Sequence, residues 1–261
     1  MPKSQHRYTY NKFHPISVHT LYKQLSQVPY ILSTGCQLID KLLGGGIHSN
    51  GGIYEFVGEA GVGKTQLIYQ LCIQCQLYSI HGGLNGAVIY INTESSMRTD
   101  RLQQMASEMS KRHPWMLEHN NSEYNWLEYI LHYQVNSIDE LDNAIHIHVN
   151  KLLNENNNDD TLMPIKLIVI DSIASVFRTD RHDNYNTIKS TRYNNINHDK
   201  HIQSTIASNN SDTLFKISNK LKQLSAQYKL SVVILNQVSD LFIDNTYNNY
   251  TMYVLIELYY I

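Results

Sequence analysis

The sequence predicts an α/β fold in which helices cover both faces of a mostly parallel, twisted sheet. Short and almost continuously apolar runs rich in β-branched residues alternate with longer segments of helical periodicity. One of these runs leads directly into a glycine-rich turn and then a helical segment. Alternation of this kind favours right-handed crossovers between parallel strands. Ligands are then expected at the carboxyl ends of the strands.

Five apolar runs are short enough to be strands buried on both faces of the sheet. They are residues 53–57, 87–91, 130–135, 167–170 and 232–235.

Three segments have the three- and four-residue spacing of amphipathic helices, namely 66–78, 138–152 and 214–228. The first is expected to end at Gly82 and Gly83. Ser137 followed by Glu140 forms a capping-box pattern at the start of the second. Asp212 is the expected N-cap of the third.

The composition limits the class of protein. The chain has 261 residues with a net charge of −2, and 42% hydrophobic with 17% charged residues excludes a wholly disordered chain or a uniformly basic coat protein. Three cysteines cannot form a secreted disulfide framework, and no N-terminal apolar run marks a signal peptide. The most apolar stretches are too short to span a bilayer. We therefore expect an intracellular protein without a membrane segment.

Composition also suggests a division of the chain. Residues 1–30 contain four Lys or Arg and no acidic residue, as in a basic tail or linker. Residues 31–240 are the predicted core, with an Asn-rich insertion at 180–211. Residues 241–261 have acidic residues and many tyrosines but no Lys or Arg, so we expect an atypical tail and a sheet truncated at its C-terminal end. The Asn-rich tracts, at 154–158, 184–197, 208–210 and 245–249, are predicted loops or insertions.

The glycine-rich turn matches the phosphate-binding pattern G-x-x-x-x-G-K-[ST]. Its residues are Gly58, Glu59, Ala60, Gly61, Val62, Gly63, Lys64 and Thr65. The glycines let the backbone amides face phosphates, the lysine reaches the outer phosphates, and the threonine hydroxyl suits Mg²⁺. Because a predicted strand precedes the motif and a predicted helix follows it, nucleotide binding is favoured over a chance glycine-rich turn.

Three polar residues stand where predicted strands end. Asp171 follows the strand at 167–170 and would hold Mg²⁺ or its waters beside the phosphate loop, although any buried strand can end in Asp. Glu94 would orient or deprotonate a water; the alternative is a carboxylate favoured by a helix N-terminus. Gln237 would sense the γ-phosphate or is simply a surface amide.

Other residues that could bind metals, take part in redox chemistry or contact nucleic acid also have simpler structural interpretations. Cys72 and Cys75 have redox-motif spacing but lie inside a predicted helix, so core packing is expected. His146 and His148 are about 200° apart around their helix and cannot chelate one ion together. Residues 178–201 have five basic and three acidic residues, which suits weak contact with a nucleic-acid backbone or a polar insertion.

The motifs together resemble the RecA-like recombinases. The phosphate loop, Thr93-Glu94, the strand ending at Asp171-Ser172 and Asn236-Gln237-Val238 occur in that family's order. Residues 32–47, which include Leu-Leu-Gly-Gly-Gly-Ile, more narrowly resemble the eukaryotic recombinase paralogs. The resemblance covers about residues 31–240 and implies a RecA-like P-loop NTPase core.

This resemblance also implies functional roles for individual residues. The loop 58–65 with Gln66 would bind ATP, and Arg101 would stack on adenine. Thr65 and Asp171 would hold Mg²⁺. Lys64, Glu94 and Gln237 would act in hydrolysis, with Glu94 activating water and Gln237 linking the γ-phosphate to a DNA-facing loop.

The resemblance implies a nuclear, slow, DNA-dependent ATPase that assists homologous recombination repair of double-strand breaks. Its expected partners are DNA, bound weakly through phosphate contacts, and other recombinase paralogs or the central recombinase. Two alternatives remain open from the sequence. One is a scaffold that binds nucleotide without significant turnover, and the other is a small-molecule P-loop phosphotransferase.

Overall fold

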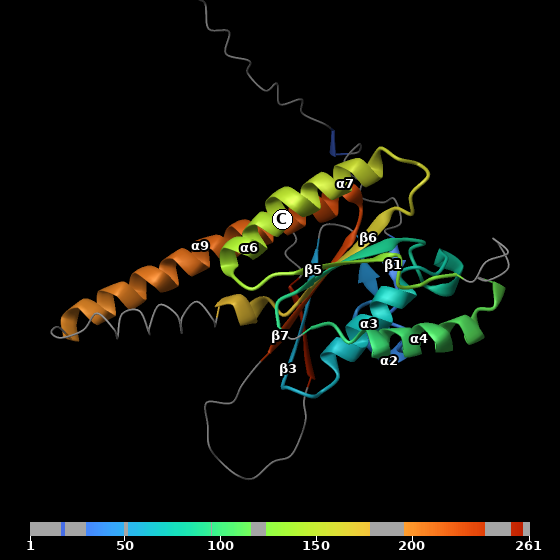
Figure 1. Cartoon of the computed structure of the whole chain (residues 1–261), viewed down its shortest axis with the longest axis horizontal. Coiled ribbons are helices and arrows are strands. Elements are labelled where there is room, and N and C mark those ends of the chain that lie inside the picture. The colour runs from blue at the N-terminus through green and yellow to red at the C-terminus, as the bar shows by residue number, and fades with distance from the viewer. Residues whose placement is uncertain are drawn as a thin grey trace, which may run out of the picture.

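The computed structural model describes residues 17–18, 30–49, 52–94, 96–115, 124–177, 196–237 and 252–257, with backbone alone at 196–209 and 252–257. Its centre is a six-stranded sheet of order β5-β4-β6-β7-β3-β8 (Figure 1). Those strands span Ile130–Gln134, Ala87–Asn92, Ile165–Asp171, Ser231–Gln237, Ile53–Gly58 and Met252–Glu257, respectively. The first five are mutually parallel, which confirms the predicted α/β fold and all five predicted strands.

Helices cover both faces of the sheet, as predicted. One face packs against α3 (Lys64–Gln74) and α4 (Thr99–Arg112), and the other against α6 (Ile138–Asn143), η2 (Ala144–Val149), α7 (Asn150–Asn157) and α9 (Ile196–Tyr228). These two groups lie on opposite sides of the sheet in Figure 1.

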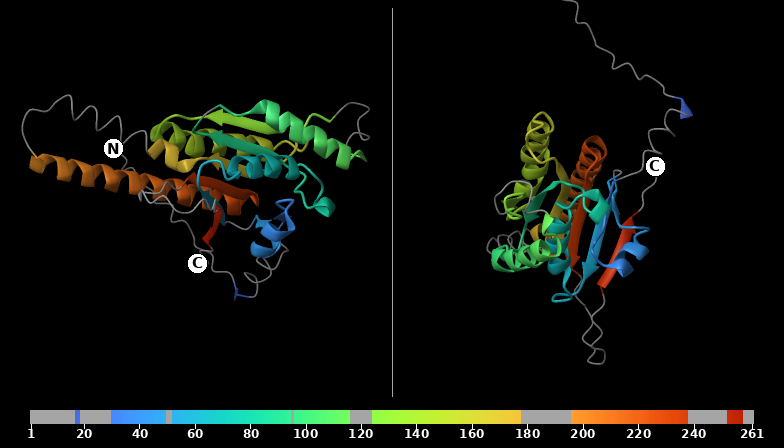
Figure 2. Two further views of the ribbon diagram at one scale, coloured as in Figure 1. Left: turned by 90° about the horizontal axis from the view of Figure 1, so that it is seen from below. Right: turned by 90° about the vertical axis from the view of Figure 1, so that its right-hand side faces the viewer.

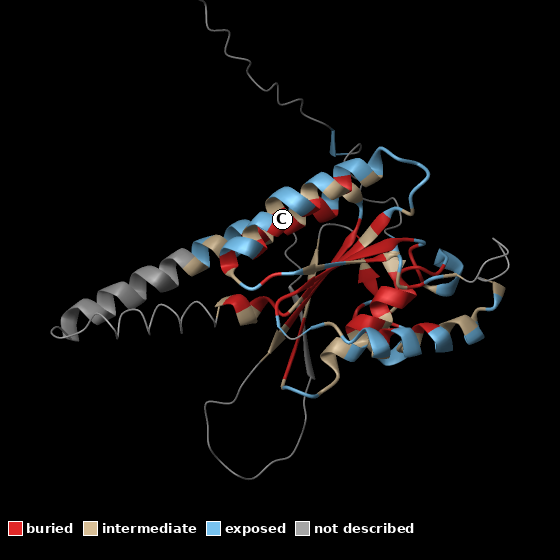
Figure 3. Cartoon of the chain, in the orientation of Figure 1, coloured by how far each residue is buried: buried red, intermediate tan, exposed pale blue. Residues whose placement is uncertain are grey.

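Alternate residues of the central strands enter the two cores. In β4, Val88 and Tyr90 pack toward α3 and α4, whereas Ile89 and Ile91 pack toward the other helices. Figure 3 shows the strands as the buried centre, with the outer helix faces exposed. Because both faces are covered, the strands are apolar throughout, which is the pattern that predicted them.

A small motif precedes the phosphate loop. Strands β1 (Ile31–Leu32) and β2 (Ile47–His48) pair antiparallel and flank α2 (Gln37–Leu42). The Asp40 carboxylate accepts hydrogen bonds from the hydroxyls of Ser33, at 2.6 Å, and Thr34, at 2.7 Å. This carboxylate therefore fixes the turn that leads into α2.

Helix boundaries differ from those predicted. Helix α3 ends at Gln74, and a 3₁₀ turn, η1 (Ser79–His81), follows before Gly82. The N-cap is confirmed, because the Ser137 hydroxyl accepts from the Glu140 amide at 3.2 Å, while the Glu140 carboxylate accepts from the Asn136 amide at 2.7 Å instead of from the Ser137 amide of a full capping box. The helix that starts there continues through η2, a π-helical segment, to Asn157.

Two predictions about the Asn-rich tracts are wrong. Residues 154–157 belong to α7, and residues 208–210 lie inside α9 rather than in a loop. Helix α9 already begins at Ile196, so Asp212 is an interior residue and not an N-cap. Asparagine has a low intrinsic helix propensity, but packing elsewhere along a helix can override this local preference.

Residues 241–261 are predicted to be an atypical tail, and within them residues 252–257 form an antiparallel edge strand, β8. Its six residues pair antiparallel with β3, from Met252 opposite Gly58 to Glu257 opposite Ile53, at the edge of the sheet (Figure 2). Without this strand β3 would present a row of unpaired backbone groups, which gives the pairing its physical reason.

Among the described residues, no helix has the length and hydropathy needed to cross a membrane.

Candidate nucleotide site

The phosphate loop connects the carboxyl end of β3 to the start of α3. Gly61 and Gly63 adopt φ values of 82° and 96°, in the left-handed region where a side chain would be strained. An added Cβ at either glycine would meet no atom within 4 Å, so the loop has open space beside it. This backbone delivers the positive end of α3 to that space, where an anion is favoured.

The side chain of Lys64 folds back onto the first residues of the phosphate loop. Its ammonium group donates to the carbonyl oxygens of Gly58 and Glu59, both at 2.7 Å. Burial lowers the pKa of Lys64, while the nearby Asp171 and Glu94 carboxylates oppose that shift. The ammonium group is therefore held close to the loop that is expected to bind phosphate.

The pair expected to hold Mg²⁺ is brought together although it is far apart in the sequence. The Thr65 hydroxyl donates to Asp171 Oδ2 at 3.1 Å, and Asp171 ends β6. Hydroxyl and carboxylate oxygens are the hard ligands that Mg²⁺ takes, so these residues fit the ion. Burial raises the pKa of Asp171, and hydrogen bonds from Tyr90 and Thr65 act against that rise.

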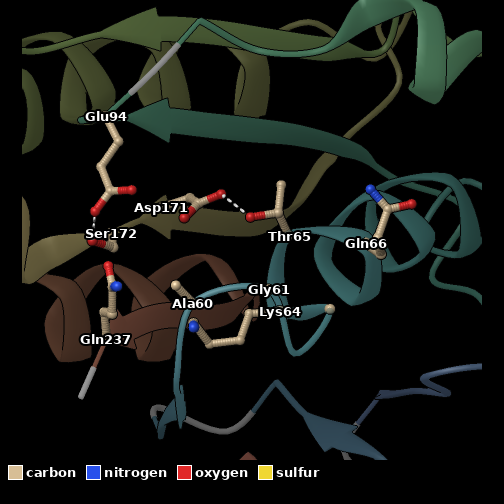
Figure 4. A pocket seen from close by; sticks show the side chains of 10 residues that line it. Ala60, Gly61, Lys64, Thr65, Gln66, Glu94, Asp171, Ser172 and Gln237 are labelled. Carbon is tan, nitrogen blue, oxygen red and sulfur yellow. Dashed lines mark hydrogen bonds between the residues drawn. The ribbon is translucent and has the colours of Figure 1, made fainter. Parts of the chain in front are cut away.

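Glu94 and Gln237 complete the same cavity, which has a volume of about 360 Å³. Figure 4 shows these side chains, from the ends of β4 and β7, facing the phosphate loop and Asp171. The cavity is lined by Ala60, Gly61, Gly63, Lys64, Thr65, Gln66, Glu94, Asp171, Ser172 and Gln237. The residues predicted to bind phosphate, to hold Mg²⁺ and to orient water therefore line one cavity.

Arg101 lies outside this cavity. Its Nε donates to Gln66 Oε1 at 2.7 Å, and its guanidinium also contacts Gln104. With Gln104 and Met105 it lines a second cavity, of about 490 Å³, between α3 and α4. Gln66 links the two cavities, and the expected stacking of Arg101 on adenine stays a prediction.

Three predicted loop residues do not line the cavity. Gly58 and Glu59 contribute the carbonyl oxygens that hold Lys64, and Val62 lies between the two left-handed glycines.

Ser172 and Tyr90 also contact the site, although neither was assigned a role in it from the sequence. The Ser172 hydroxyl donates to Glu94 Oε1 at 2.9 Å, and the Tyr90 hydroxyl donates to Asp171 Oδ2 at 2.7 Å. A buried tyrosine needs a partner for its hydroxyl, so Tyr90 within an otherwise apolar strand was an available signal.

Among the residues that the structure describes, the cysteines and histidines do not gather into a second site. Cys72 and Cys75 are fully buried in the core, as predicted, and burial raises the pKa of both thiols. His148 is exposed, and His146 pairs with Asp142 at 3.1 Å. Across the described part of the chain, no three His, Cys, Asp or Glu side chains gather where they could bind a metal. Of residues 178–201, predicted to touch a nucleic-acid backbone or to form a polar insertion, 178–195 lie outside the described residues and 196–201 belong to α9.

Comparison with known proteins supports the resemblance seen in the motifs. The Rad51 family matches residues 26–248. The chain is 34% identical over 210 residues to the DNA repair protein XRCC3 homolog of Arabidopsis thaliana, covering 80% of this chain and 60% of that protein. It is 31% identical over 212 residues to the DNA repair protein RAD57 of Saccharomyces cerevisiae, covering 81% of this chain and 39% of that protein.

A third relative is the DNA repair and recombination protein RadA of Aeropyrum pernix, with 34% identity over 156 residues, 57% of this chain and 41% of the relative. The chain therefore spans less than two thirds of the length of each of these relatives. Within the recombinase paralogs, the motifs around Lys64-Thr65-Gln66-Leu67 and Asp171-Ser172 resemble X-ray repair cross-complementing protein 3, in agreement with the Arabidopsis relative. The fold, the arrangement of the phosphate loop and the match over most of the sequence agree: the chain belongs to the Rad51 family of RecA-like recombinases.

Proposed function

We propose that this chain binds ATP with Mg²⁺ and assists homologous recombination repair of DNA double-strand breaks as a recombinase paralog. The observation that carries this proposal is the contact of Thr65 with Asp171 in the cavity that also contains Lys64 and Glu94. Its family supports the repair role, since the three relatives are named as DNA repair or recombination proteins.

The proposed chemistry is slow, DNA-dependent hydrolysis of ATP. Backbone amides of the loop and the Lys64 ammonium would hold the phosphates, and Thr65 with Asp171 would hold Mg²⁺. The ion supplies positive charge that stabilises the charge developing on the phosphate oxygens. Glu94 would orient and deprotonate a water, and Gln237 would contact the γ-phosphate at the end of β7.

The proposed setting is the nucleus, where the chain would work with other recombinase paralogs or the central recombinase and bind DNA weakly. Residues 1–30 would serve as a basic linker, residues 31–240 as the ATP-binding core with the insertion at 180–211, and residues 241–261 as an atypical tail that includes β8.

Two substitutions separate binding from turnover. Lys64→Ala removes a charge-assisted contact worth about 1.5–3 kcal/mol and should weaken ATP binding roughly ten- to a hundredfold. Glu94→Gln keeps the shape but loses the carboxylate, so ATP affinity should persist while turnover falls. Equilibrium ATP binding and phosphate release, each with Mg²⁺ and DNA, measure the two effects.

Lys111→Ala is the matched control, because Lys111 is an exposed lysine in α4 that pairs with Glu108 away from the cavity. It should change neither quantity. Equal ATP affinity in Lys64→Ala and in Lys111→Ala would contradict the nucleotide site. Unchanged phosphate release in Glu94→Gln would assign Glu94 to a structural role, and release at the background rate in both the unmutated chain and the variant would favour the scaffold hypothesis.

A further inference from the structure

We propose that Tyr90 and Ser172 are positioning residues that hold the two carboxylates of the nucleotide site, Tyr90 holding Asp171 and Ser172 holding Glu94. The inference rests on the proposed function and extends it. Each hydroxyl belongs to a buried residue, and each donates to a different carboxylate.

Tyr90 is a rigid donor. It lies in β4 directly opposite Val169 of β6, the strand that ends at Asp171, and its side chain is 1% exposed. Its ring packs beside Tyr69, with centroids 6.1 Å apart. Because a central strand and its neighbours fix the ring, the hydroxyl stays 2.7 Å from Asp171 Oδ2.

The Asp171 carboxylate needs such a donor. It ends a buried strand and receives two hydroxyl donors on Oδ2, one from Tyr90 and one from Thr65. Thr65 belongs to the phosphate loop, whereas Tyr90 belongs to the sheet. Tyr90 therefore fixes the carboxylate independently of the loop, which keeps its oxygens oriented toward the place where Mg²⁺ would be held.

Ser172 is fixed by its backbone. Its amide donates to Thr93 Oγ1 at 2.9 Å, and the Thr93 hydroxyl donates to the Ser172 carbonyl oxygen at 2.5 Å. These reciprocal bonds join the ends of β4 and β6 immediately beside Glu94. The Ser172 hydroxyl then reaches Glu94 Oε1 at 2.9 Å, as Figure 4 shows. The carboxylate expected to act on water is thus attached to the strand that carries Asp171.

The two assignments predict different effects: the Tyr90 variant should change the Mg²⁺ dependence of ATP binding, and the Ser172 variant should change ATP turnover. Tyr90→Phe should raise the Mg²⁺ concentration for half-maximal ATP binding roughly tenfold, because a hydrogen bond to a charged group is lost. Ser172→Ala should leave that concentration unchanged and lower phosphate release roughly tenfold at saturating ATP. Ser172→Thr retains a hydroxyl and should restore release.

Equilibrium ATP binding over a Mg²⁺ titration, phosphate release and thermal melting are measured on the full chain. Tyr69→Phe is the control for Tyr90→Phe, because Tyr69 is also buried and its hydroxyl instead accepts from the Arg98 amide at 3.0 Å. This control should keep the unmutated Mg²⁺ dependence.

The outcomes separate this inference from the proposed function. An unmutated chain that binds no ATP overturns both. An unmutated chain that needs Mg²⁺, with Tyr90→Phe and Ser172→Ala indistinguishable from it, overturns only the positioning roles. Loss of folding in Tyr90→Phe or Ser172→Ala, with Tyr69→Phe intact, would make that residue structural and would also overturn its assignment.

Discussion

Two glycines of this chain share a backbone conformation but differ in their surroundings. Gly61 has a φ of 82° and lines the nucleotide cavity, whereas Gly44 has a φ of 71° and lies after α2. A Cβ at either position would meet no atom within 4 Å. Alanine would therefore strain both backbones without a steric clash, so the pair separates strain from function.

We predict that Gly61→Ala and Gly44→Ala each reduce the free energy of unfolding by about 1–2 kcal/mol, because a left-handed conformation is costly for a side chain. Only Gly61→Ala should also weaken ATP binding, since its loop would relax away from the conformation that presents its amides. Urea denaturation and equilibrium ATP binding give the two readouts. Equal ATP affinities in both variants would show that the loop conformation does not matter for binding.

Single residues were predictable from the sequence where a motif fixes their spacing. The phosphate loop and Asp171 follow from local patterns, and the structure places them at the carboxyl ends of β3 and β6, where they line one cavity. Tyr90 and Ser172 were missed because their roles depend on the pairing of β4 with β6, which residue spacing does not reveal. The position of Arg101 outside the cavity likewise depends on how α4 packs on α3.

At the scale of elements, the strands were easier to predict than the helix ends. A strand buried on both faces is apolar over its whole length, so its sequence shows where it begins and ends. A helix has apolar residues at regular spacing only in the part that packs against the core. In α9 the apolar spacing comes from Ile217, Leu221 and Leu224, which pack on the sheet. The helix starts well before them, so its beginning could not be located from the spacing.

The start of α6 was located because its cap is a local signal. We predict that Ser137→Ala lowers the free energy of unfolding by about 1 kcal/mol, since the Glu140 amide loses its acceptor. Ser107→Ala is the matched control, because the Ser107 hydroxyl donates to the Gln103 carbonyl oxygen on the exposed face of α4 and alanine is the better helix former there. Urea denaturation of both variants tests the cap; equal stability would contradict it.

For the whole molecule, neither strand order nor charge distribution follows from one local pattern. Both β6 and β7 lie between β4 and β3, and β8 joins the far edge in the opposite direction. These pairings join residues distant in sequence, so the five parallel strands were predicted but their order was not. Charge is similarly uneven, since a chain of net charge −2 begins with thirty residues that have four positive charges and no negative one.

That unevenness leads to a prediction about DNA. Because a near-neutral chain would bind phosphates through local basic segments, affinity for single-stranded DNA should be weak, fall with salt and show little sequence preference. Replacing Lys3, Arg7, Lys12 and Lys23 by Gln should reduce the slope of log affinity against log salt concentration by up to about 3, at about 0.7 per phosphate contact.

The control is neutralisation of Lys111 and Lys151, exposed lysines paired with Glu108 and Glu155, which should leave the slope unchanged. Titrations at several salt concentrations measure the slopes. A slope that stays the same after the four N-terminal substitutions would assign DNA contact to another part of the chain, and binding that ignores salt would indicate stacking on bases instead of contact with phosphates.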